Sequence, residues 1–114
     1  MQNQVIGGIL GFVVGGALGV PVEVESREEL RADPVVSMRS GGSHGQAKGT
    51  WSDDSSMTLC LMESLTNNNL DFNDVCVRFL NWAENGYMTA HGEMFDIGRT
   101  TLTAIRKFAC GKPP

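Results

Sequence analysis

Residues 51–66 read WSDDSSMTLCLMESLT, and this stretch combines the clearest helical pattern of the chain with its strongest candidate site. Apolar side chains recur every three or four residues from Met57 to Leu65. This period is typical of an α-helix that buries one face, and it predicts a helix from about Asp53 to Thr66. The helix therefore begins on a run of carboxylate and hydroxyl side chains.

Other segments carry helical signals of the same kind, and no alternating strand pattern or internal repeat competes with them. Because the patterns have a helical period and end on Asn, Gly or Pro, we predict an all-α fold. The expected helices are the apolar run around residues 5–19, a short helix at 27–32 behind the capping box of Ser26 and Glu29, a helix from Asp71 to Asn85 ended by Gly86, and a last helix that ends near Ala109.

Length and charge limit the class of protein. The 114 residues have the length of one domain, so we expect a single domain over residues 1–114. The net charge is -4 and the Lys and Arg residues are scattered, which argues against nucleic acid as a partner. Cys60, Cys76 and Cys110 form no metal-binding motif, and we expect reduced thiols packed in helices of a cytoplasmic protein.

The N-terminal run from Val5 to Val22 has no charged residue and is just long enough to span a membrane. Its six glycines, Pro21 and the absence of flanking basic residues favour a buried helix of a soluble protein instead. Gly7, Gly11, Gly15 and Gly19 recur every four residues, so they would form a bare stripe that lets another backbone approach.

The tetrad Trp51-Ser52-Asp53-Asp54 has two interpretations. Ser52 is a favourable N-cap, and the helix dipole favours Asp53 and Asp54 in the first turn, so all three residues can be explained by capping. The same hydroxyl and carboxylate oxygens are the hard ligands that Mg²⁺ and Ca²⁺ prefer. Capping requires only one such side chain, so the excess keeps the metal hypothesis open.

Other polar residues have weaker signals. Glu23 ends an apolar run and could be a surface residue or a general base, and Asp96 is best explained as a cap of the last helix. His44 and His91 have no partner at ligand spacing, so we expect solvated or loop-packing roles. Residues 40–49 consist of turn-forming types and predict a flexible loop.

Three separated segments together resemble the ADP-ribosylglycohydrolase family, which includes the dinitrogenase reductase-activating glycohydrolases. They are GGALGVPVE at 15–23, GTWSDDSSMTL at 49–59 and FDIGRTT at 95–101. The middle segment is the most specific, and the order and separation of all three match. The resemblance covers essentially the whole chain and the N-terminal part of the family's orthogonal helical domain.

This resemblance implies a metal-assisted hydrolase that cleaves the glycosidic bond of ADP-ribosylated proteins or small ADP-ribose derivatives at a pair of Mg²⁺ ions. By the family's motifs, Ser52, Asp53 and Asp54 would be metal ligands. Glu23 would be the catalytic carboxylate near the metal and the ribose. Asp96 and Gly98 would contribute to the ADP-ribose cleft.

The chain also departs from the family pattern. Gly16 replaces a frequent Asp, Arg99 replaces a frequent Asn, and nothing after Arg99 resembles the second aspartate cluster that completes the metal site. We therefore expect these residues to supply part of the centre, with a complementing chain or self-association through exposed apolar surface. The alternative is a non-catalytic helical module, truncated or like the lens crystallin members of the family.

Overall fold

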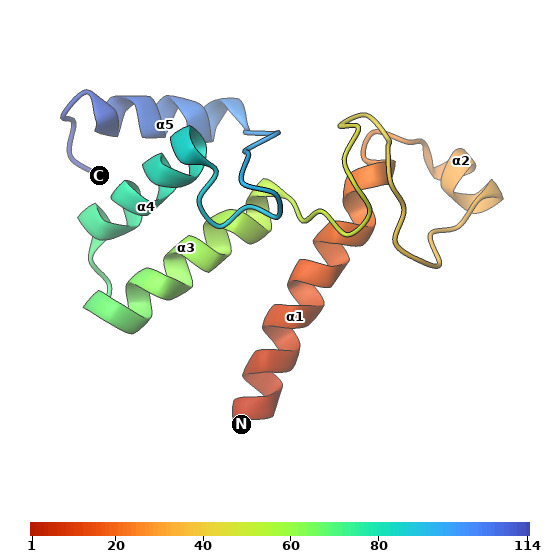
Figure 1. Cartoon of the computed structure of the whole chain (residues 1–114), viewed down its shortest axis with the longest axis horizontal. Helices are drawn as coiled ribbons and strands as arrows, with labels where there is room; N and C mark the ends of the chain where they lie inside the picture. Colours follow the sequence, from red (N-terminus) through yellow and green to blue (C-terminus); the bar gives the residue numbers. More distant parts are fainter. The chain divides into compact units, whose positions relative to one another are not determined.

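The computed structural model covers all 114 residues, with the exception that the side chain of Asn68 is not described. The predicted all-α fold is confirmed, because the described residues contain helices and a single isolated β-bridge but no strand. Contacts divide the chain into two compact units, Met1–Ser55 and Ser56–Pro114. The expectation of one domain stays a prediction, and each unit is described by itself (Figure 1).

The first unit is built on α1, Gln2–Gly19, which continues into the short 3-10 helix η1, Val20–Val22. Pro21 lies within η1 and is buried, as are Ala17 and Val20, so the packed part of this unit lies at the C-terminal end of α1. The short helix α2, Arg27–Ala32, begins on the predicted capping box. The Ser26 hydroxyl accepts a hydrogen bond from the Glu29 amide at 3.2 Å, and the Glu29 carboxylate accepts one from the Ser26 amide at 2.7 Å.

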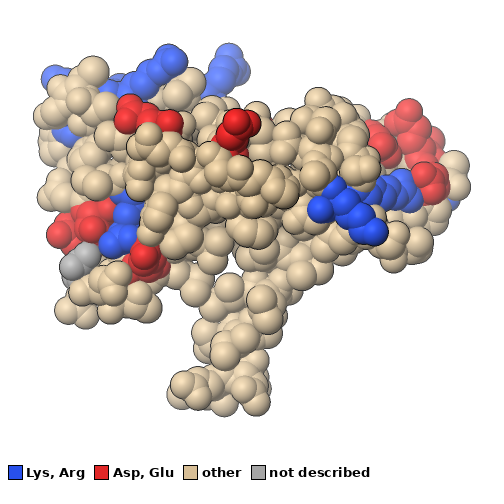
Figure 2. Space-filling model, viewed as in Figure 1, with Lys and Arg blue, Asp and Glu red and all other residues tan. Residues whose placement is uncertain are grey.

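Most of α1 is exposed, although its composition predicts a buried helix. Five of its large apolar side chains are about half exposed, from 46% at Val14 to 58% at Leu10. In the space-filling view the N-terminal part of α1 shows no charged side chain on the visible face (Figure 2). Gln2–Val22 is long and apolar enough to cross a membrane, a property shared by signal sequences and by core helices of soluble proteins.

The second unit packs three helices around one core. α3 spans Asp53–Asn68, α4 spans Phe72–Asn85 and α5 spans Arg99–Ala109, and the first residues of α3 belong to the first unit. Each of the three helices contributes one buried side chain to the core, which consists of Cys60, Trp82 and Ile105. Trp82 is the largest of these side chains and is almost fully buried.

Local signals begin and end α4 as predicted. Asp71 is the N-cap of α4, where its side chain accepts from the amides of Asn73 and Asp74. Gly86 ends α4 in the left-handed conformation, with φ of 69°. The interpretation of Asp96 as the cap of α5 is wrong, because the N-cap position belongs to Gly98, two residues later.

The cysteines are free, as expected, but only one is fully buried. Burial raises the pKa of the Cys60 thiol to about 11, since the thiolate would lose its hydration there. Cys76 is half-buried on α4. The expectation that all three pack within helices is wrong for Cys110, which is exposed and follows the last residue of α5.

Candidate functional site

Two segments of the first unit form a hollow at the C-terminal end of α1. One segment is the end of α1 with η1 and Glu23, and the other is the start of α3. The hollow has a volume of about 240 Å³. Its lining includes four of the predicted site residues, namely Glu23, Ser52, Asp53 and Asp54.

A turn places the tetrad at this hollow. The amide and the hydroxyl of Thr50 both donate to the carbonyl of Ala47, at 3.2 Å and 2.7 Å, and Gly49 adopts a positive φ of 83° between them. Thr50 is buried, which fixes the chain just before the tetrad. Ser52 and Asp53 are then half-buried and Asp54 is exposed, so hydroxyl and carboxylate oxygens remain accessible to small ligands.

Gly16 allows α1 to lie close to the start of α3. A Cβ atom at Gly16 would lie 3.1 Å from Ser55 Oγ and 3.5 Å from Ser52 Oγ. The four glycines of the predicted stripe have no such neighbour within 4 Å, so the close approach occurs at Gly16 instead. The Ser55 hydroxyl is buried and makes no hydrogen bond to any described residue.

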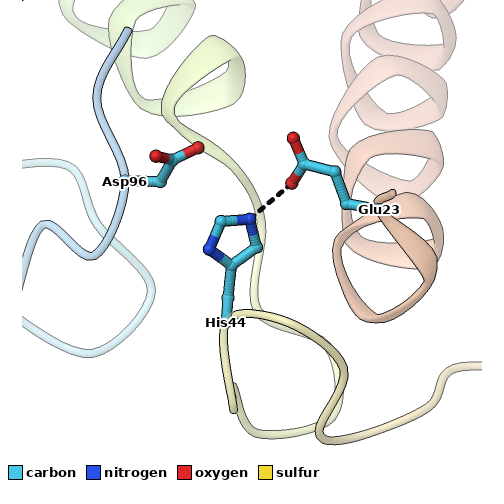
Figure 3. A group of neighbouring side chains, drawn as sticks. All are labelled: Glu23, His44 and Asp96. Atoms are coloured by element: carbon cyan, nitrogen blue, oxygen red, sulfur yellow. Dashed lines mark hydrogen bonds and ion pairs between the residues drawn. The ribbon is translucent and has the colours of Figure 1, made fainter. Parts of the chain in front are cut away.

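Glu23 has a partner that the sequence patterns did not predict. Its Oε2 lies 2.6 Å from Nε2 of His44, and the two side chains point toward each other (Figure 3). The expectation of a solvated or merely packed loop histidine is therefore wrong. The residues are 21 positions apart, and no periodic or ligand-spacing motif joins them, so only the path of the loop brings them together.

Asp96 and Gly98 belong to the second unit. Asp96 is half-buried in the connection between α4 and α5, and Gly98 is exposed at the start of α5. Neither residue lines the hollow of the first unit. Their roles in binding ADP-ribose remain predictions, as do the metal-binding roles of Ser52, Asp53 and Asp54.

Comparison with known proteins decides the family. The family model described as ADP-ribosylglycohydrolase matches residues 1–114. The chain belongs to the ADP-ribosylglycohydrolase family. Family membership confirms the resemblance drawn from the three motifs.

Relatives of this family are similar to the chain over most of its length. The ADP-ribosylarginine hydrolase Tri1 of Serratia proteamaculans (strain 568) is 33% identical over 103 residues, which are 90% of this chain and 27% of the relative. Tri1 of Pseudomonas putida (strain GB-1) is 32% identical over 100 residues, 87% of this chain and 26% of the relative. The ADP-ribosyl-[dinitrogen reductase] glycohydrolase of Rhodospirillum rubrum is 30% identical over 111 residues, which are 95% of this chain and 35% of the relative. The chain thus spans about a quarter to a third of the length of these relatives.

Proposed function

We propose that the hollow at the end of α1 is part of a hydrolase site that cleaves the glycosidic bond of ADP-ribosylated substrates. The observation that carries the proposal is the convergence of Glu23 with Ser52, Asp53 and Asp54 on one hollow, from segments about thirty residues apart. Helix capping explains a carboxylate at the start of α3. It does not explain why Glu23 lines the same hollow.

The donor set of the hollow fits a hard divalent cation. Three carboxylates and a hydroxyl offer only oxygen ligands, and the partial exposure of the tetrad leaves room for water, which Mg²⁺ retains in protein sites. We propose that Ser52, Asp53 and Asp54 would hold Mg²⁺. Two six-coordinate ions need more donors than these side chains provide, so we propose that further ligands come from outside the 114 residues.

The chain's own residues then have distinct tasks. When bound, the metal would act as a Lewis acid and stabilise the negative charge that develops in the transition state. The carboxylates of Asp53 and Asp54 add negative charge beside a sugar that becomes cation-like as the glycosidic bond breaks. The Glu23 carboxylate accepts a proton from the attacking water or a hydrogen bond from a ribose hydroxyl.

We propose arginine-linked ADP-ribose as the first substrate to test, because two of the relatives are named as ADP-ribosylarginine hydrolases. The dinitrogen reductase glycohydrolase suggests ADP-ribose linked to a protein as a second substrate to test.

We further propose a cytoplasmic location, since the free cysteines fit a reducing compartment.

The test is release of ADP-ribose from an ADP-ribosylated arginine peptide with and without Mg²⁺. The chain is assayed alone and with a polypeptide that supplies the remainder of a family domain. Asp53→Asn should abolish release, because the amide loses the charge that holds the ion while the side chain keeps nearly its shape. Asp71→Asn is the matched control, since Asn caps helices as well as Asp. Mg²⁺-independent release, or full activity of Asp53→Asn, would overturn the proposal.

A non-catalytic interaction module is the second candidate, and the exposed apolar side chains of α1 favour it. Apolar surface of this extent usually marks a contact with another chain or another part of a domain. A chain that self-associates but binds no Mg²⁺ would support this candidate over the hydrolase.

A further inference from the structure

Glu23 occupies a constrained turn. It follows η1 with φ of -56° and ψ of 135°, and the Glu25 amide donates to the Val22 carbonyl at 3.1 Å. The next residue, Val24, has a φ of 71°. A β-branched side chain in this left-handed region is strained, and such strain persists only where neighbouring contacts hold the backbone.

A hairpin formed by residues 41–46 supplies such contacts. The Gly41 amide donates to the Gln46 carbonyl at 2.8 Å, which closes the hairpin through an isolated antiparallel bridge. At Gly42 the backbone lies against η1 so closely that a Cβ atom would be 2.0 Å from the Pro21 carbonyl oxygen. The Ser43 hydroxyl donates to the Glu23 carbonyl at 3.4 Å.

The hairpin also carries His44 to the Glu23 side chain. The Gln46 side-chain amide donates to the His44 carbonyl at 3.0 Å, which ties the histidine backbone within the hairpin. A carboxylate only accepts hydrogen bonds, so the 2.6 Å contact requires a proton on His44 Nε2. The contact uses Oε2 of Glu23, while the other carboxylate oxygen points away from the ring (Figure 3).

We propose that His44 is a positioning residue that fixes the Glu23 carboxylate at the hollow. The His44 side chain is 20% exposed, whereas that of Glu23 is 51% exposed and has several rotatable bonds. Without a partner, such a glutamate would sample several rotamers. Binding one oxygen to the hairpin leaves the second oxygen oriented for water or a ribose hydroxyl, so the role rests on the hydrolase function proposed above.

The bond itself is tested without metal or substrate. Nitrogen-15 NMR of the full chain observes two imidazole rings, His44 and His91. We expect the His44 ring to be protonated at Nε2 and its signals to shift on Glu23→Gln substitution. His91, which is exposed in the second unit, should not respond. Unchanged His44 signals in Glu23→Gln would overturn the inference.

The positioning role is tested by kinetics under the conditions in which the wild type releases ADP-ribose. His44→Ala should lower kcat by about tenfold to a hundredfold with little change in KM, because a misplaced group slows the chemistry more than it weakens binding. His44→Gln should restore much of the rate, since its amide donates from nearly the position of Nε2. His91→Ala is the matched control and should retain full activity.

The two failures are distinguishable. Wild-type kcat in His44→Ala, or a His44→Gln variant no faster than His44→Ala, would overturn the positioning role while the hydrolase function stands. Absence of Mg²⁺-dependent release in the wild type, with the His44 ring still responding to Glu23→Gln, would overturn the hydrolase function instead.

Discussion

Gly42 determines whether the hairpin of residues 41–46 can lie against η1. Gly42 has a positive φ of 71°. A Cβ atom at this position would lie 2.0 Å from the Pro21 carbonyl oxygen, so any side chain there would clash with the backbone of η1. Gly45 has a similar φ of 60° but open space around it. The two glycines therefore separate the effect of crowding from the effect of backbone conformation.

We predict that Gly42→Ala lowers the free energy of unfolding more than Gly45→Ala does. Gly45→Ala should cost only the left-handed conformation, about 1 kcal/mol. Gly42→Ala adds a clash that displaces the hairpin, so it should also change the NMR signals of the His44 ring. Denaturant unfolding measures the stabilities, and equal losses for the two variants would contradict the described packing.

The candidate site was only partly predictable from the sequence. Ser52, Asp53 and Asp54 are contiguous and begin a helix, so their motif was visible, although capping explained them equally well. Glu23 could be a surface residue or a general base, and only the family resemblance favoured the catalytic role. The contact of His44 with Glu23 depends on the path of a glycine-rich loop, and no local pattern encodes such a path.

Among the elements, α2 shows how local signals determine a short helix. The pKa of the Glu29 carboxyl is lowered below its usual value of 4.5. The main cause is the hydrogen bond from the Ser26 amide, and the contact with the Ser26 hydroxyl is the second cause. The stabilisation from this contact is therefore present above pH 4.5 and is lost as the pH falls through the lowered pKa.

We predict that Ser26→Ala raises the pKa of Glu29 part of the way back toward 4.5, because one half of the capping box is removed while the backbone amide remains. Carbon-13 NMR of the Glu29 carboxyl during a pH titration measures the change. Ser37→Ala, an exposed serine outside the helices, is the control. An unchanged pKa in Ser26→Ala would show that the capping box does not form in solution.

Helix boundaries followed from the sequence where caps are local. Ser26 begins α2, Asp71 begins α4 and Gly86 ends it, each through contacts within a few residues. The environment of α1 was less predictable, because burial depends on contacts far along the chain. Its apolar composition correctly predicts a helix, but the glycine stripe finds no close neighbour in the described structure.

For the whole molecule, the exposed apolar side chains of α1 predict self-association. Ile6 and Leu10 are 53% and 58% exposed and lie one turn apart on the helix. We predict that wild-type chain forms oligomers in light scattering and that the double variant Ile6→Gln/Leu10→Gln shifts toward the monomer. Val77→Gln, which replaces a similarly exposed side chain on α4, should not. A monomeric wild type at all concentrations would contradict this role of α1.

The family model matches the whole chain, while the chain spans about a quarter to a third of the length of its relatives. The hollow in the first unit contains the hydroxyl and carboxylates of the second family motif together with the glutamate of the first. We propose that Ser52, Asp53 and Asp54 bind Mg²⁺ at this hollow.

Calorimetric titration of Mg²⁺ into the wild type, Asp53→Asn and Asp71→Asn measures this binding. Both substitutions remove one carboxylate at the start of a helix, and Asn preserves capping. We predict saturable binding by the wild type and Asp71→Asn, and loss of binding by Asp53→Asn. Equal binding by all three proteins, or no binding by the wild type, would contradict the assignment of the tetrad as a metal site.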